Sequence, residues 1–96
     1  MISAILEASN GRIVGIAGQP GNEGYLCQKD PVRFPYLSQV DCFSYAIFIC
    51  YDMQGLLAEL GSLSPPHGED VAAIMALAER CRSEPDYSLS FTPFGE

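Results

Sequence analysis

Apolar and polar residues alternate loosely on both sides of the dipeptide Asn10-Gly11. Asn-Gly between two such segments is a strong hairpin signal, because a type I′ turn needs positive φ angles at both central residues. The pattern therefore predicts two half-buried strands, Ile2–Glu7 and Arg12–Ile16, joined by a type I′ turn. The glycine-rich stretch that follows, residues 18–24, predicts a loop, and residues 25–28 allow a short strand.

A longer alternating segment runs from Cys42 to Tyr51, and both of its faces are apolar. One face consists mostly of small side chains, and the other is bulky. The bulky face comprises Phe43, Tyr45, Ile47, Ile49 and Tyr51. This pattern predicts a central strand with helices on one side and a partly covered surface on the other. The aromatic side chains fit either a core or a protein interface, and the sequence leaves both open.

Two further segments carry apolar residues at helical spacing. The first is predicted to begin after Asp52 as N-cap and to end at Gly61. Its buried stripe is Met53, Leu56, Leu57 and Leu60. The second helix is predicted from Pro65-Pro66 to about Ser83, because proline is tolerated in a first helical turn. Its buried stripe is Val71, Ile74, Met75, Ala78 and Cys81.

Alternation returns at residues 87–92 and predicts a last strand. The resulting order predicts an α+β fold: a small, mostly antiparallel sheet with two helices packed on one face. The sheet would contain the N-terminal hairpin, the central strand and the C-terminal strand. A length of 96 residues allows one domain, residues 1–96.

Charge is distributed unevenly along the chain. The chain has 5 Lys and Arg against 12 Asp and Glu, a formal net charge of −7. Residues 1–40 are neutral overall, whereas residues 41–79 hold six carboxylates and no Lys or Arg. This balance argues against nucleic acid and against anionic membranes as partners. It favours a basic protein partner, although helix capping and solubility would explain the same carboxylates.

No pattern in the sequence indicates a metal, cofactor or catalytic site. The four cysteines, Cys27, Cys42, Cys50 and Cys81, lack the close pairs of structural zinc sites. With no secretory signal or membrane span in the sequence, we expect a cytoplasmic protein with reduced thiols. His67 is the single histidine, so an enzyme working at neutral pH would need it or a shifted carboxylate.

The middle of the chain resembles a group of short bacterial proteins of uncharacterised function. Their shared pattern is F-P-x-L-x-x-[IV]-D, an aromatic residue, F, and then M-x-x-L-L-x-E-L. In this chain the pattern reads Phe34-Pro35-Tyr36-Leu37, Val40-Asp41, Phe43, Phe48, Met53 and Leu56-Leu57-Ala58-Glu59-Leu60. Small, acidic bacterial proteins of this kind resemble immunity proteins, which neutralise a cognate toxin by covering its active site.

These features predict a non-enzymatic binding protein, an immunity protein for a basic toxin domain such as a nuclease. The residues expected to contact the partner are Asp41, Tyr45, Asp52, Glu59, Glu69 and Asp70. The alternative is a homo-oligomeric structural or regulatory protein, in which the aromatic stripe is buried against a second copy.

Overall fold

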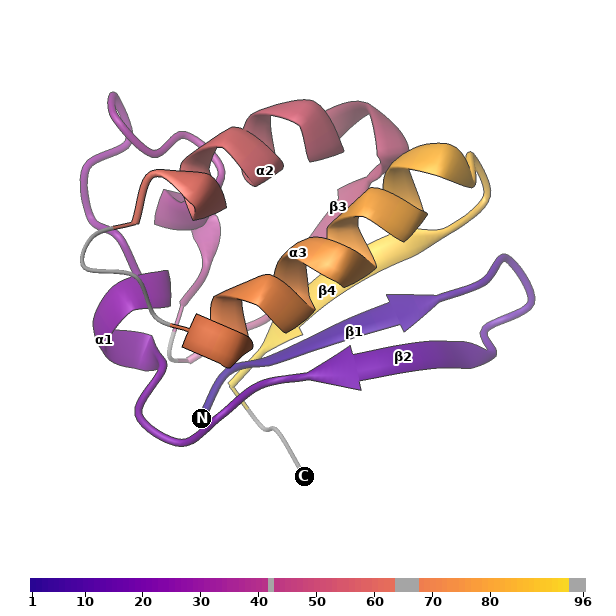
Figure 1. The fold of residues 1–96 in the computed structure, drawn as a ribbon, viewed down its shortest axis with the longest axis horizontal. Helices are drawn as coiled ribbons and strands as arrows, with labels where there is room; N and C mark the ends of the chain where they lie inside the picture. The colour runs from indigo at the N-terminus through magenta and orange to yellow at the C-terminus, as the bar shows by residue number, and fades with distance from the viewer. Residues whose placement is uncertain (42, 64–67, 94–96) are drawn as a thin grey trace.

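The computed structural model describes residues 1–41, 43–63 and 68–93. The predicted α+β class is confirmed: four antiparallel strands form one sheet in the order β2-β1-β4-β3. The strands are β1 (Ser3–Glu7), β2 (Ile13–Ala17), β3 (Ala46–Ile49) and β4 (Ser88–Thr92). The helices α2 (Met53–Gly61) and α3 (Gly68–Ser83) lie on the same side of this sheet (Figure 1).

The hairpin forms where Asn10-Gly11 predicts it, but its turn differs from the predicted one. The Gly11 N–H donates to Ala8, the Ala8 N–H donates to Arg12, and of these loop residues only Gly11 has positive φ. This is a three-residue loop with glycine in the left-handed position, not a type I′ turn. The difference arises because Asn10 keeps a negative φ and its side chain accepts a hydrogen bond from the Arg12 N–H instead.

A bulge changes which β2 side chains face outward. Leu6 pairs with Gly15 and Glu7 with Ile13, so Val14 is the extra residue on β2. Two residues three positions apart normally lie on opposite faces of a strand, but the bulge turns both Ile13 and Ile16 outward. Both are more than half exposed.

The short strand at residues 25–28 does not form. Its start belongs instead to α1 (Glu23–Leu26), a single turn whose Leu26 is buried. Buried Asn22 holds this turn against the start of β1, since its side chain accepts from the Ile2 N–H and donates to the Ile2 carbonyl oxygen. A nearby polar anchor therefore overrides the weak strand pattern.

The strand at residues 42–51 is shorter than predicted and is not central. Regular pairing covers Ala46–Ile49, and a 3₁₀ turn, η2 (Cys50–Asp52), then leads into α2. β4 inserts between β1 and β3, which leaves β3 at the edge of the sheet. Cys42 lies outside the described residues.

The core lies between the sheet and the two helices. The predicted stripe of α2 is buried, as is that of α3 except for half-buried Met75. From the sheet, Leu6, Phe48, Leu89 and Phe91 point into this core. Phe48 packs edge-on against Phe91 and against Tyr36, with ring centroids 5.8 and 5.9 Å apart. In the part of the chain that the structure describes, no helix lies over the other face of the sheet (Figure 1).

Candidate functional site

The bulky stripe of residues 43–51 lies on the surface of the molecule. Its exposed fractions are 86% for Phe43, 65% for Tyr45, 56% for Ile47, 48% for Ile49 and 86% for Tyr51. The alternate residue Phe48 is only 2% exposed, so the predicted alternation is present in β3. We call these five exposed side chains, together with Asp41 and Asp52 at the two ends of the segment, the β3 surface.

Two of the carboxylates predicted to contact a partner lie in the interior. Glu59 is buried on α2, and its carboxylate accepts hydrogen bonds from the backbone N–H groups of Tyr36 and Leu37, at 3.1 and 2.8 Å. These residues begin the 3₁₀ turn η1 (Leu37–Gln39), whose first N–H groups have no partner within the turn. Glu59 therefore holds this turn against α2 and is not accessible to a partner.

Asp70 is 1% exposed in the first turn of α3. Its Oδ2 accepts a hydrogen bond from the Tyr25 hydroxyl, while its buried Oδ1 has no hydrogen-bond partner among the described residues. Burial, and then the hydrogen bond to Asp70, raise the pKa of Tyr25 because both disfavour the phenolate. Asp70 thus joins α3 to α1 inside the fold, and it cannot contact a partner without rearrangement.

The remaining predicted carboxylates are accessible, and each lies on a different segment of the chain. Asp41 is exposed, and its carboxylate accepts from the Phe43 N–H at 2.9 Å. Asp52 is half-buried and accepts from the Ile49 N–H at 3.0 Å, rather than making a side-chain cap on α2. Glu69 is exposed on the first turn of α3. Glu79 on α3 is also exposed, so four of the six carboxylates in residues 41–79 remain at the surface.

The cysteines differ in their surroundings. Cys81 is fully buried on α3, and burial, then the nearby Cys50 and Asp52, raises its pKa to about 11. Cys27 and Cys50 are half-buried cysteines. Within residues 1–41, 43–63 and 68–93, no group of His, Cys, Asp and Glu side chains could hold a metal ion. The predicted candidate base His67 lies outside these residues.

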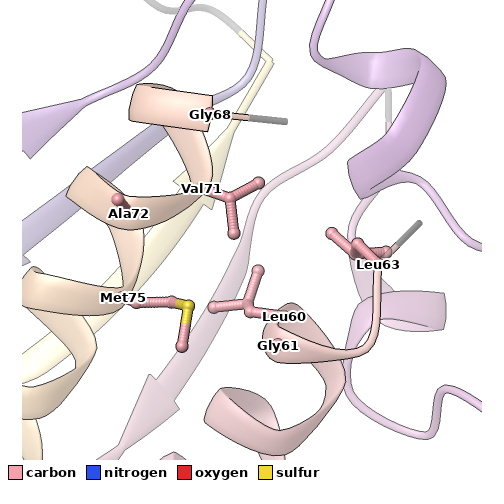
Figure 2. A pocket seen from close by; sticks show the side chains of 7 residues that line it. All are labelled: Leu60, Gly61, Leu63, Gly68, Val71, Ala72 and Met75. Atoms are coloured by element: carbon pink, nitrogen blue, oxygen red, sulfur yellow. The ribbon is translucent and has the colours of Figure 1, made fainter. Parts of the chain in front are cut away.

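The surface pockets lined by described residues include two of a few hundred cubic ångströms. One, of about 250 Å³, lies between the end of α2 and the start of α3, where Leu60, Leu63, Val71 and Met75 line it (Figure 2). The described side chains that line it are apolar, and none of them offers a polar group to orient a small molecule. The other, of about 320 Å³, has Lys29 on its lining and shares Asp41 and Phe43 with the β3 surface.

Sequence reasoning missed the second part of the exposed apolar surface, on β2 and β1. Ile13 and Ile16 lie on the outer face of the sheet with half-buried Ile5 between β2 and β4. The odd spacing of Ile13 and Ile16 hid this, because only the bulge at Val14 places both on one face.

No protein-family model, curated protein or solved structure matches this chain. Among the described residues, no helix has the length and apolar character needed to cross a bilayer. The resemblance of residues 34–60 to short bacterial proteins stays an expectation from the sequence.

Proposed function

We propose that this chain is a non-enzymatic protein-binding module that holds a basic partner on the β3 surface. The observation that carries the proposal is the exposure of five large apolar side chains along one short segment. Adjacent exposed apolar side chains of this size mark interaction sites more often than ordinary surface. Tyrosine is also enriched among the residues that dominate binding energy, because its ring is large and its hydroxyl can hydrogen-bond.

Charge supports a basic partner. From Phe34 to Glu79 the sequence has no Lys or Arg, and Asp41 and Asp52 stand at the two ends of the exposed segment. Carboxylates around an apolar centre would accelerate the approach of a positively charged surface and orient it on contact.

The partner class we propose is a toxin domain, such as a nuclease, which makes this chain an immunity protein. A nuclease needs a positively charged surface to bind the phosphates of its substrate. An acidic protein with an apolar centre would compete for that surface and block the active site. Small size, net negative charge and the resemblance of residues 34–60 support this class by analogy.

The test is affinity capture from the native host with three baits: the wild type, Tyr45→Ala and Asp41→Lys. A charge-matched control is Glu84→Lys, an exposed carboxylate beyond α3. Titration calorimetry with the purified partner should show a loss of about 1–3 kcal/mol for Tyr45→Ala. Binding should weaken about tenfold between 50 and 300 mM NaCl, because salt screens opposite charges. Adding the chain should inhibit the activity of the partner.

A captured protein that binds Tyr45→Ala and Asp41→Lys as tightly as the wild type would refute the proposed surface. Binding that is indifferent to salt would refute the electrostatic part, and a partner that stays fully active in the complex would refute the immunity role.

A further inference from the structure

We infer that, in the absence of a partner, a second copy of this chain packs on the outer face of the sheet. The two sheets lie face to face, related by a two-fold axis that runs parallel to the strands through the centre of the face. This inference goes beyond the proposed function, and it uses residues on all four strands.

The strand register arranges the outer face in two rows that cross the sheet. Along the order β2, β1, β4, β3, the first row is Ile16, Ile5, Ser90 and Ile47. In the same order, the second row is Ile13, Glu7, Ser88 and Ile49. Both rows have isoleucine at the two edges, and β4 contributes only a small serine to each.

The two-fold axis reverses the strand order of the second copy without shifting the rows. Strand β2 of one copy then lies over β3 of the other, and β1 lies over β4. Aligned sheets pack in this way, with their strands rotated by about 30° because each sheet is twisted. An interface of this kind is isologous, so each contact occurs twice.

Each side chain meets a suitable neighbour in this arrangement. The exposed Ile16 and Ile13 face Ile47 and Ile49 of the second copy. The larger Ile5 faces the small Ser90, which leaves room for it. Glu7 is the only ionisable residue in the two rows, and it faces the Ser88 hydroxyl, which can donate a hydrogen bond.

The face of the sheet supplies part of the area that a stable dimer needs, and the flanking aromatic side chains supply the rest. Four strands about 4.8 Å apart and five residues about 3.4 Å long give a face of about 19 by 17 Å. The exposed aromatic residues of the β3 surface extend it, since an aromatic side chain buries about 150–250 Å². Together these approach the value of about 800 Å² per partner that is typical of specific complexes.

Pairing through the free edge of β3 is less favourable than packing through its face. The Asp52 carboxylate already accepts from the Ile49 N–H, which would otherwise be open to another strand at this edge. Such carboxylates on edge strands block the addition of a further strand. Asp52 blocks the edge but does not cover the outward-facing side chains of β3.

Net charge opposes the dimer only weakly at physiological salt. Each copy carries −7, and stacked copies would have their centres about one shortest dimension apart, 23 Å. That spacing is almost three Debye lengths at 0.15 M salt, where the Debye length is about 8 Å, but less than one at 0.01 M. The dimer should therefore tighten at least threefold from 0.01 to 0.15 M, whereas binding of a basic partner should weaken.

The dimer and the proposed partner complex both use Ile47 and Ile49, so they exclude each other. The two proposals fail separately. A monomeric chain would overturn the dimer and leave the partner site intact, whereas Asp41→Lys should weaken partner binding and leave the dimer unchanged.

The experiment is analytical ultracentrifugation of the wild type from 1 to 300 µM at 0.15 M NaCl. We expect a reversible dimer, and at least a tenfold rise in its dissociation constant for Ile16→Lys and for Ile47→Glu. Val32→Lys is the matched control, because Val32 is 91% exposed and belongs to neither row, and it should change the constant less than twofold.

The decisive variant combines Ile16→Lys with Ile47→Glu in one chain. These positions lie on opposite edges of a sheet, three strand spacings or about 14 Å apart, so they attract each other only between copies. The double variant should bind at least tenfold more tightly than either single variant. If one substitution unfolds the chain by circular dichroism, Ile13→Lys with Ile49→Glu replaces the pair. A monomer at 300 µM, insensitivity to the single changes, or absence of rescue would each overturn the inference.

Discussion

The two faces of the sheet both carry large apolar side chains but have opposite surroundings. On the inner face Phe48, Leu89 and Phe91 are at most 2% exposed, whereas on the outer face Ile47 and Ile49 are about half exposed. Both faces belong to the same four strands, and the two helices cover only the inner one. The comparison separates residues that stabilise the monomer from residues that only another molecule could bury.

The carboxylates show the same division. Glu59 and Asp70 hold interior hydrogen bonds between distant segments, whereas Asp41 and Glu69 lie at the surface. Only the second group can interact with a charged partner, although all four come from the same acidic half of the sequence.

The largest expected effect is that of Phe48→Ala, at about 3–5 kcal/mol of unfolding free energy. The substitution removes a ring that packs against Phe91 and Tyr36 and leaves a cavity in the core. Its neighbour Ile49→Ala, on the outer face, should cost less than about 1 kcal/mol. Urea unfolding curves measure both, and equal losses would contradict the assignment of the two faces.

The second-largest expected effect separates a buried carboxylate from an exposed one. Glu59→Ala leaves the N–H groups of Tyr36 and Leu37 without their acceptor, and we expect a loss of about 3 kcal/mol. Asp41→Ala removes one exposed hydrogen bond and should cost about 0.5 kcal/mol. The same urea curves test both variants. A loss below 1 kcal/mol for Glu59→Ala would show that Glu59 does not stabilise the fold through these hydrogen bonds.

Local pattern was enough to predict the fold class and the faces of most elements. Helical spacing identified the buried stripes of α2 and α3, and alternation separated Phe48 from Ile47 and Ile49. It could not tell which face of residues 43–51 points inward. That depends on β4, about 40 residues later in the chain, pairing between β1 and β3.

The carboxylates were harder to assign for the same reason. Nothing near Glu59 in the sequence indicates burial, because the N–H groups that it accepts from lie 22 and 23 residues earlier. Asp70 has an ordinary position in a first helical turn, and its partner Tyr25 is 45 residues away. A buried carboxylate is recognised by its long-range partners, which composition and spacing do not show.

Substituting alanine for each of two glycines of α2 should change the stability in opposite directions. A Cβ at Gly55 would overlap the Tyr36 ring, whereas at Gly61 the nearest atom is Met75 Cε at 3.9 Å. Gly55→Ala should therefore destabilise the chain by about 1 kcal/mol, since displacement of Tyr36 from Phe48 outweighs the better helix propensity. Gly61→Ala should stabilise it by up to about 1 kcal/mol. Thermal unfolding measures both, and destabilisation by Gly61→Ala would contradict this packing.

Alkaline pH should lower the free energy of unfolding, because Cys81 is buried on the inner side of the molecule. Its pKa is raised from 9.0 to about 11, so the native state holds the thiol proton more tightly than the unfolded state. The resulting stability is fully present below pH 9 and is lost as the pH rises to 11, by about 1 kcal/mol at pH 10. In Cys81→Ala this component should disappear from urea curves at pH 8 and 10. An unchanged pH dependence would show that Cys81 is not its source.

The smallest effect concerns the free edge of β3, where the inner and outer faces meet. Asp52→Ala removes the acceptor of the Ile49 N–H, which is exposed, so water can replace it at a cost of about 0.5–1 kcal/mol. Asp52→Asn retains a side-chain oxygen and should keep most of that stability. The two variants differ more in association, because Asp52→Ala also opens the edge to another strand. If light scattering finds larger species for Asp52→Ala but not for Asp52→Asn, the side-chain hydrogen bond to the Ile49 N–H protects the edge. The outer face of β3 is then the part of the strand left open to contact. If both variants aggregate alike, net charge rather than the hydrogen bond protects this edge.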